Sequence, residues 1–300
     1  MKNRNINYRK TIPALLIALV LGCFSLSPSV KAASDSRQPE KFTQIDVPGA
    51  IFTIATDINA QGEILGFYLD SSGNLHGFLL SNGVFTTIDV PGAAHLTIAT
   101  GINPRGEIVG LYDDSSGNRD GFLLSKGAFT TIDVPGATLT VASGINSEGD
   151  IVGDYFDSSG NRHAYLLSKG AFKTIDFPGA GTFGRDVEGI NPRGDITGFY
   201  EDSRGNTHGL LQSKGKFTTI DVPGAIQTFL VKINPQGDIT GAYIDSSGNT
   251  HGFVLSKGKF TTIDVAGAVF TEASGINPRG DIVGDYIDSS GNDHGFLLSK

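Results

Sequence analysis

The sequence predicts an all-β fold, a six-bladed β-propeller of four-stranded antiparallel blades in which the N-terminal strand completes the last blade. Three observations support this prediction: a repeat with a period near 43 residues, turn residues that divide each repeat into four short strands, and the places where the array starts and stops. The repeats occupy residues 41–300 as one domain. A period of this length with strand-rich content is typical of propeller blades.

The repeat is marked by a phenylalanine that precedes Thr-Thr-Ile-Asp or a close variant of it. This residue is found six times, at Phe42, Phe85, Phe129, Phe172, Phe217 and Phe260. The spacings between copies are 43 to 45 residues. The sequence also has 41 glycines, no tryptophan and a single methionine, the first residue. This composition suits short strands and tight turns, and no long stretch follows a helical period.

Turn residues divide the second repeat into four predicted strands. The predicted strands are residues 97–102, 107–113, 121–125 and 129–134. The turns between them contain Asn103-Pro104-Arg105-Gly106, Ser115-Ser116-Gly117-Asn118 and Lys126-Gly127. Proline presets the backbone for a turn and glycine supplies the positive φ that closes it, so each repeat is predicted to be a meander of three hairpins.

The ends of the array predict how the ring closes. The chain enters at the fourth strand of a repeat, residues 41–47, and leaves after the third strand of the last repeat, residues 294–299. The first strand therefore has no blade of its own, while the last blade lacks its outer strand. Pairing the two covers both exposed edges and completes six blades.

Residues 1–32 have the pattern of a secretory signal peptide. Four basic residues precede an apolar run over residues 12–24, and Val30-Lys31-Ala32 forms a small-residue cleavage pattern. We expect cleavage near Ala32, with lipidation at Cys23 as the alternative because Leu21-Gly22-Cys23 is similar to a lipobox. Residues 33–40 are polar and are predicted to be a leader to the array. The protein is predicted to be secreted, extracellular or periplasmic, without a membrane span.

The charge of the exported chain excludes one class of partner. Residues 1–32 hold five of the 23 basic residues and none of the 31 acidic ones, which leaves a net charge of −13 on the remainder. Nucleic-acid binding depends on clustered lysine and arginine, so a nucleic-acid partner is not expected. The ring should be a monomer whose partner is a small ligand or another macromolecule.

The repeated motifs resemble those of the bacterial extracellular repeat proteins of the HAF family. The resemblance covers residues 41–300 and rests on GINPRGDIVGDY, DSSGN, and His-Gly-Phe-Leu-Leu or His163-Ala164-Tyr165. Glycine replaces the usual alanine in most copies, and Asp120 replaces the histidine in the second. The resemblance implies export and a β-propeller, and it carries no established activity.

The repeated polar residues are interpreted as structural. Five histidines recur on the third strand, but equivalent positions in a sixfold ring lie too far apart to share one metal ion. Each is expected to order its own DSSGN turn or to bond a neighbouring blade. The aspartate that opens each turn is expected to cap backbone N–H groups. No metal or cofactor is predicted.

A specific binding site should break the sixfold pattern, because one ligand needs unlike groups. Asp57 and Lys232 replace the glycine of the other four repeats on the innermost strand. The loop before that strand is lengthened at His95 and near Arg185, Asp186 and Glu188. We therefore predict a ligand or partner site at the channel mouth and on the loop face, the face of the ring that carries the DSSGN turns and the lengthened loops. The alternative interpretation is that these differences are neutral sequence variation at solvent-exposed loop tips.

No sequence motif indicates catalysis. A GxSxG nucleophile, a closely spaced histidine pair and a strand-to-helix phosphate loop are all missing. A binding or scaffold module is therefore preferred over an enzyme. The alternative is a propeller hydrolase or lyase at the channel mouth, with His95 as the base and Glu188 or Asp186 as its partner, which depends on fold analogy alone.

Overall fold

The structure, a computed structural model, describes residues 41–175, 177 and 185–300. The predicted signal peptide (1–32), the leader (33–40) and Cys23 lie outside these residues and stay predictions. All regular elements in the described ranges are β-strands. Within those ranges, no helix exists that could traverse a bilayer.

The strands form four-stranded antiparallel groups, here called blades 1 to 6, whose strands are lettered a to d from the inner to the outer edge. Blade 1 comprises β2 (Phe52–Ile58), β3 (Ile64–Leu69), β4 (Leu75–Ser81) and β5 (Val84–Ile88). Blade 2 comprises β6 (Thr97–Ile102), β7 (Ile108–Asp113), β8 (Arg119–Ser125) and β9 (Ala128–Ile132). Blade 3 comprises β10 (Leu139–Ile145), β11 (Ile151–Phe156), β12 (Arg162–Ser168) and β13 (Ala171–Ile175).

The second half of the chain repeats this order. Blade 4 comprises β14 (Arg185–Ile190), β15 (Ile196–Glu201), β16 (Thr207–Ser213) and β17 (Lys216–Ile220). Blade 5 comprises β18 (Gln227–Ile233), β19 (Ile239–Ile244), β20 (Thr250–Ser256) and β21 (Lys259–Ile263). Blade 6 comprises β22 (Phe270–Ile276), β23 (Ile282–Ile287), β24 (Asp293–Ser299) and β1 (Lys41–Ile45).

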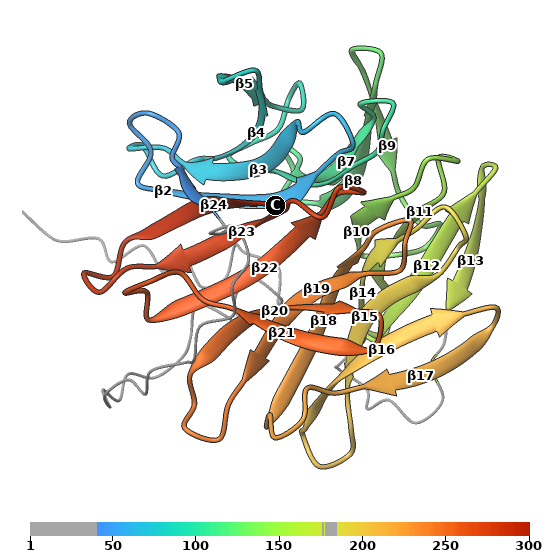
Figure 1. Cartoon of the computed structure of the whole chain (residues 1–300). Coiled ribbons are helices and arrows are strands. Elements are labelled where there is room, and N and C mark those ends of the chain that lie inside the picture. Colours follow the sequence, from blue (N-terminus) through green and yellow to red (C-terminus); the bar gives the residue numbers. More distant parts are fainter. Residues whose placement is uncertain (1–40, 176, 178–184) are drawn as a thin grey trace, which may run out of the picture. The chain divides into compact units, whose positions relative to one another are not determined.

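The first strand of the array pairs with the last. β1 runs antiparallel to β24 from Lys41 opposite Ser299 to Ile45 opposite Gly295. Blades 1 to 4 are separate sheets, whereas one parallel pair, Thr250 with Phe270, joins blades 5 and 6. β2 contacts β22, β23 and β24, so the blue and red ends of the array lie side by side (Figure 1). The chain is an all-β propeller with four-stranded antiparallel blades.

Short turns give each blade its register. Asn82 and Gly83 have φ of 51° and 78°, and Lys126 and Gly127 repeat this pair with 51° and 79°. Two successive positive φ values match the twist of a two-residue hairpin, so the predicted c–d turns are confirmed. The third strand of blade 2 begins at Arg119, two residues earlier than predicted, because Arg119 pairs with Asp113 at 2.7 Å and extends the ladder between β7 and β8.

The hydrophobic core lies between the blades. Ile88 of blade 1 packs in one buried cluster with Ile102, Ile108 and Phe122 of blade 2. The isoleucine near the end of strand a is at most 8% exposed in every blade, at Ile58, Ile102, Ile145, Ile190, Ile233 and Ile276. This residue contributes to the core between the blades, as Ile102 does beside Ile88 and Ile145 beside Val109. A rigid stack of blades then holds the channel and the surface grooves in place.

Candidate functional site

Asp57 and Lys232 lie where the inner strands approach one another most closely. Four blades have glycine here because a Cβ has no room. At Gly144 it would lie 2.8 Å from the Glu188 carbonyl oxygen, and at Gly275 it would lie 2.7 Å from the Cα of Asp57. The side chains of Asp57 and Lys232 instead line a cavity of about 80 Å³ between the inner strands. The structure thus brings these two predicted residues to one place.

The charges of both residues are used inside the protein. The Lys232 ammonium, in a side chain 7% exposed, donates to the backbone carbonyls of Ser143 at 2.6 Å and Glu188 at 2.8 Å. The Asp57 carboxylate accepts a hydrogen bond from the Ile102 N–H at 3.0 Å. Burial raises the pKa of Asp57, and the Lys232 charge opposes this shift. Asp57 thus links the inner strands of blades 1 and 2, and Lys232 links those of blades 3, 4 and 5.

Lys232→Ala is expected to lower the free energy of unfolding by about 3 kcal/mol, because it leaves the buried Asp57 carboxylate without its nearby cation. The double variant Asp57→Gly, Lys232→Gly restores the residue of the other four blades and should recover most of this loss. Urea unfolding of the wild type and both variants measures the difference. Equal stability of the wild type and Lys232→Ala would contradict the internal role of the lysine.

Asp186 and Glu188 lie within β14, not at the tip of the lengthened loop expected from the sequence. Asp186 is 4% exposed and forms an ion pair with Arg162 of blade 3, which also lies 3.5 Å from Asp154. Burial raises the pKa of Glu188 to about 7, against the opposing charges of Lys232 and Arg162. These carboxylates therefore lie inside the ring, beside the buried cations Arg162 and Lys232 of the neighbouring blades. The side chain of Arg185, the first residue of β14, lies outside the described part of the chain.

His95 lies apart from the other candidates. It is exposed on the loop before β6, and its carbonyl oxygen accepts a hydrogen bond from the Leu75 N–H of blade 1 at 2.9 Å. Within residues 41–175, 177 and 185–300, no hydrogen bond or ion pair joins His95 to Asp186 or Glu188. The predicted residues therefore do not form one site. Asp57 and Lys232 line the channel cavity and the Glu188 carbonyl binds Lys232, whereas His95 is on the surface.

Three buried carboxylates in blade 6 were missed by the sequence analysis. Glu272 and Asp285 face each other across β22 and β23, and Asp293 follows on β24. Burial, with Asp285 and Glu188 nearby, raises the pKa of Glu272 well above its ordinary value. The signal was present in the sequence, because Ile54 stands at the place of Glu272 in blade 1. These residues break the sixfold pattern as clearly as Asp57 does.

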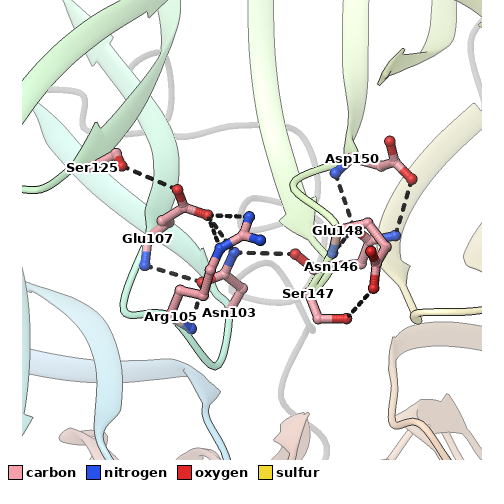
Figure 2. Close-up of polar contacts among 8 residues, drawn as sticks. All are labelled: Asn103, Arg105, Glu107, Ser125, Asn146, Ser147, Glu148 and Asp150. Atoms are coloured by element: carbon pink, nitrogen blue, oxygen red, sulfur yellow. Dashed lines mark hydrogen bonds and ion pairs between the residues drawn. The ribbon is translucent and has the colours of Figure 1, made fainter. Parts of the chain in front are cut away.

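Asparagines close the channel mouth at the turns between strands a and b. Asn103 donates to Glu107 at 2.7 Å and to the backbone carbonyl of Asn146 in blade 3 at 3.1 Å, and Arg105 pairs with the same Glu107 (Figure 2). Asn146 in turn donates to the carbonyl of Asn191 at 3.3 Å. The polar groups at this mouth satisfy one another, so they do not converge on an open position.

A larger cavity lies between blades 1 and 2. Its volume is about 430 Å³, which is in the usual range for small-molecule pockets. Leu79 of β4 and Ile108, Leu124 and Phe129 of blade 2 contribute its apolar lining. This groove could not be predicted from the sequence, because most of its residues recur in every blade and the free space depends on how two blades pack.

Polar groups border the apolar part of this groove. Thr86 of β5 and Asp89 just beyond it lie on the blade 1 side, and Lys126 in the c–d turn lies on the blade 2 side. Asp89 is half-exposed and accepts a hydrogen bond from His76 Nδ1 at 2.9 Å, which fixes the orientation of the carboxylate. The Asp89 carboxylate and the Lys126 ammonium group therefore border a cavity whose remaining lining is largely apolar.

The repeated histidines order their own blades. His251 lies between Asp264, 2.9 Å from Nδ1, and Asp245 of its own DSSGN turn, 3.4 Å from Nε2. The hydrogen bond to Asp264 raises the pKa of His251, and burial opposes it. The interpretation that each histidine orders its own DSSGN turn is confirmed for His251, whose two partners lie in the same blade. Over the described residues, no three His, Cys, Asp or Glu side chains are grouped to hold a metal ion.

Comparison with known proteins identifies similarity at the level of fold. No family model and no curated sequence matches the chain. AofleA from Arthrobotrys oligospora superposes with a TM-score of 0.58 at 13% identity, over 89% of this chain and 88% of that one. A mutant of the Aleuria aurantia lectin in complex with Fucα1-6GlcNAc gives 0.53 at 12% identity, over 86% and 93%. TolB from Acinetobacter baumannii gives 0.54 at 12% identity, over 83% of this chain and 64% of TolB. These similarities establish the propeller fold.

Proposed function

We propose that residues 41–300 form one closed six-bladed propeller with β1 as its closing strand, and that it is an exported binding module. The pairing of β1 with β24 supports the closure. So does the similarity, at a TM-score of 0.52 and 12% identity, to an Aleuria aurantia lectin structure described as a six-bladed β-propeller. Export through the signal peptide at 1–32, a monomeric state and membership of the HAF family are parts of the same proposal. Lipidation at Cys23 stays the alternative to cleavage.

The groove between blades 1 and 2 is the proposed ligand site. The single observation that carries this choice is its size, about 430 Å³, against about 80 Å³ at the channel residues Asp57 and Lys232. The smaller cavity has room for a few water molecules only. Its charged groups also already bind backbone groups, so a ligand there would have to displace internal contacts.

The ligand is proposed to be a small polar molecule with one apolar face, such as a pyranose sugar. Leu124 and Phe129 can pack against an apolar face, while Asp89 and Lys126 can accept from and donate to hydroxyl groups. The fucose-binding lectins with a similar fold make sugars the first class to test. The chain has no tryptophan, so Phe129 would supply the aromatic surface.

The hydrolase or lyase alternative has less support. It requires His95 to act with Asp186 or Glu188, but His95 is exposed on the blade 2 loop while Asp186 is ion-paired with Arg162. In a catalytic constellation of this kind, the general base is held by a hydrogen bond to the group that orients it.

Thr86→Lys is expected to weaken sugar binding at least about tenfold by filling the groove. Blade 3 has Lys173 at the equivalent strand position, so the fold tolerates this side chain. Thr261→Lys, at the same position in blade 5, is the matched control and should bind like the wild type. Isothermal titration with methyl-α-L-fucoside and other methyl pyranosides measures the affinities. Equal binding by wild type and Thr86→Lys would remove the groove from consideration.

A further inference from the structure

Three exposed aliphatic side chains occupy the same place in three consecutive blades. Ile51, Ile226 and Val269 are 58%, 53% and 46% exposed. Each donates its N–H to the carbonyl of the last residue of strand b: Ile51 to Leu69, Ile226 to Ile244 and Val269 to Ile287, all at 2.8 Å. β18 contacts β22, and β22 contacts β2, so blades 5, 6 and 1 are neighbours. Ile51, Ile226 and Val269 therefore occupy equivalent places on three neighbouring blades, on the face with the DSSGN turns, and are here called the apolar arc.

The fold does not require aliphatic residues at this place. Ala94 in blade 2 and Thr138 in blade 3 make the equivalent hydrogen bonds, to the carbonyls of Asp113 at 2.9 Å and Phe156 at 2.8 Å. A small or polar side chain thus serves the same backbone. Apolar residues scattered singly over a surface need no explanation. These three, however, recur at one place in neighbouring blades, where the fold also accepts alanine or threonine.

Carboxylates border the apolar arc. In each of these three blades, the last carbonyl of strand b accepts the hydrogen bond from the arc residue, and the next residue is the aspartate of a DSSGN turn. These aspartates are Asp70, Asp245 and Asp288. Backbone and side-chain hydrogen bonds within the turn lower the pKa of Asp288 to about 2, so this group is ionised at neutral pH. The exposed Asp46, Asp89 and Asp264 add a second acid to each of these blades, with one histidine between the two.

We propose that the apolar arc of Ile51, Ile226 and Val269 docks a segment of another protein that combines aliphatic and basic side chains. Aliphatic residues of such a segment would cover the arc, and its lysines or arginines would face the bordering carboxylates. A second copy of this chain is disfavoured as the occupant, because two such faces would bring like charges together. Asp89 belongs to both surfaces, but Ile51, Ile226 and Val269 do not line the groove between blades 1 and 2, so variants at these three residues test the docking proposal apart from the groove.

The test uses a fluorescein-labelled peptide, Lys-Leu-Lys-Val-Lys-Leu, titrated with the exported protein and followed by fluorescence anisotropy. The triple variant Ile51→Thr, Ile226→Thr, Val269→Thr, which installs the residue of Thr138, is expected to bind at least about tenfold more weakly. Val84→Thr is the matched control, because Val84 is 63% exposed on strand d of blade 1. It should bind like the wild type, and added NaCl should weaken wild-type binding.

Three results would overturn the docking proposal. The first is equal peptide binding by the wild type and the triple variant. The second is equal binding of a peptide in which glutamate replaces each lysine, because charge complementarity would then play no part. The third is a dimer in sedimentation velocity that the triple variant abolishes, because the surface would then join two copies of this chain. Thermal melting of the triple variant within about 3 °C of the wild type, less than about 1 kcal/mol for a domain of this size, is expected.

Discussion

The double variant Glu272→Gln, Asp285→Asn is expected to unfold about 10 °C above the wild type at pH 8. The two residues are direct cross-strand partners on β22 and β23, and they are 8% and 6% exposed. Like charges opposite each other destabilise a sheet, and burying them without a cation adds the cost of desolvation. The amides keep the shape of both side chains and remove the charges. Calorimetry of the two proteins measures the difference.

The same carboxylates predict how stability depends on pH. Burial and Asp293 raise the pKa of Asp285 well above its ordinary value, and burial with Glu272 raises that of Asp293 to about 8. A carboxyl group with a raised pKa keeps its proton in the folded state after the unfolded state has lost it. Stability therefore falls as the pH rises from about 4 through the folded pKa. The wild type should melt highest near about pH 5, and the double variant should show a flatter profile up to about pH 9.

Asp154→Asn is the matched control for this prediction. Asp154 holds the place of Asp285 in blade 3, but Arg162 lies 3.5 Å from it. Burial raises the pKa of Asp154 to about 7, against the opposing charge of Arg162. Removing this carboxylate therefore relieves some cost of desolvation but leaves a buried cation with one partner fewer, so the variant should gain much less stability at pH 8 than the double variant. A Glu272→Gln, Asp285→Asn variant with the melting temperature and pH profile of the wild type would contradict the account of the acidic cluster.

Deleting residues 41–50 is expected to lower the melting temperature by at least about 15 °C or to abolish the cooperative transition. The deletion removes β1 and with it the buried Ile45, the ring contact between Phe42 and Phe296 at 5.5 Å, and the ion pair of Asp46 with His294 at 3.0 Å. It also leaves the edge of β24 open to other chains. Thermal unfolding followed by circular dichroism measures the loss.

Two controls accompany the deletion of β1. Removing residues 33–40 alone should leave the melting temperature unchanged, because β1 begins at Lys41. A synthetic peptide of residues 41–50, added in excess, should restore part of the loss by pairing with β24. If the protein without residues 41–50 melts like the wild type, β1 does not close the ring.

Most of the fold could be predicted from the sequence, because each blade is specified locally. The turn at Asn82-Gly83 and the cap formed by Asn103 depend on residues within a few positions of each other. The pairing of β1 with β24 could be predicted from the strand order of the repeats, although Lys41 and Ser299 are far apart in the chain. The repeats made this prediction possible, because every blade has the same strand order and packs on its neighbours in the same way.

Much less of the candidate site could be predicted. Comparing repeats identified Asp57 and Lys232 as residues of the channel, but it could not show that the Lys232 ammonium binds the carbonyls of Ser143 and Glu188. Those contacts cross three blades and depend on their exact spacing. The groove that Phe129 lines left no trace in the sequence, since free volume between blades is a property of packing and not of any one residue.

The measurement that tests the proposed function most directly is a crystal structure of the exported protein soaked with methyl-α-L-fucoside and related methyl pyranosides. The account predicts sugar density in the groove between blades 1 and 2, within hydrogen-bond distance of Asp89 or Lys126 and against Phe129. Density at Asp57 and Lys232 in the channel, or on the loop face near His95, with an empty groove would contradict it.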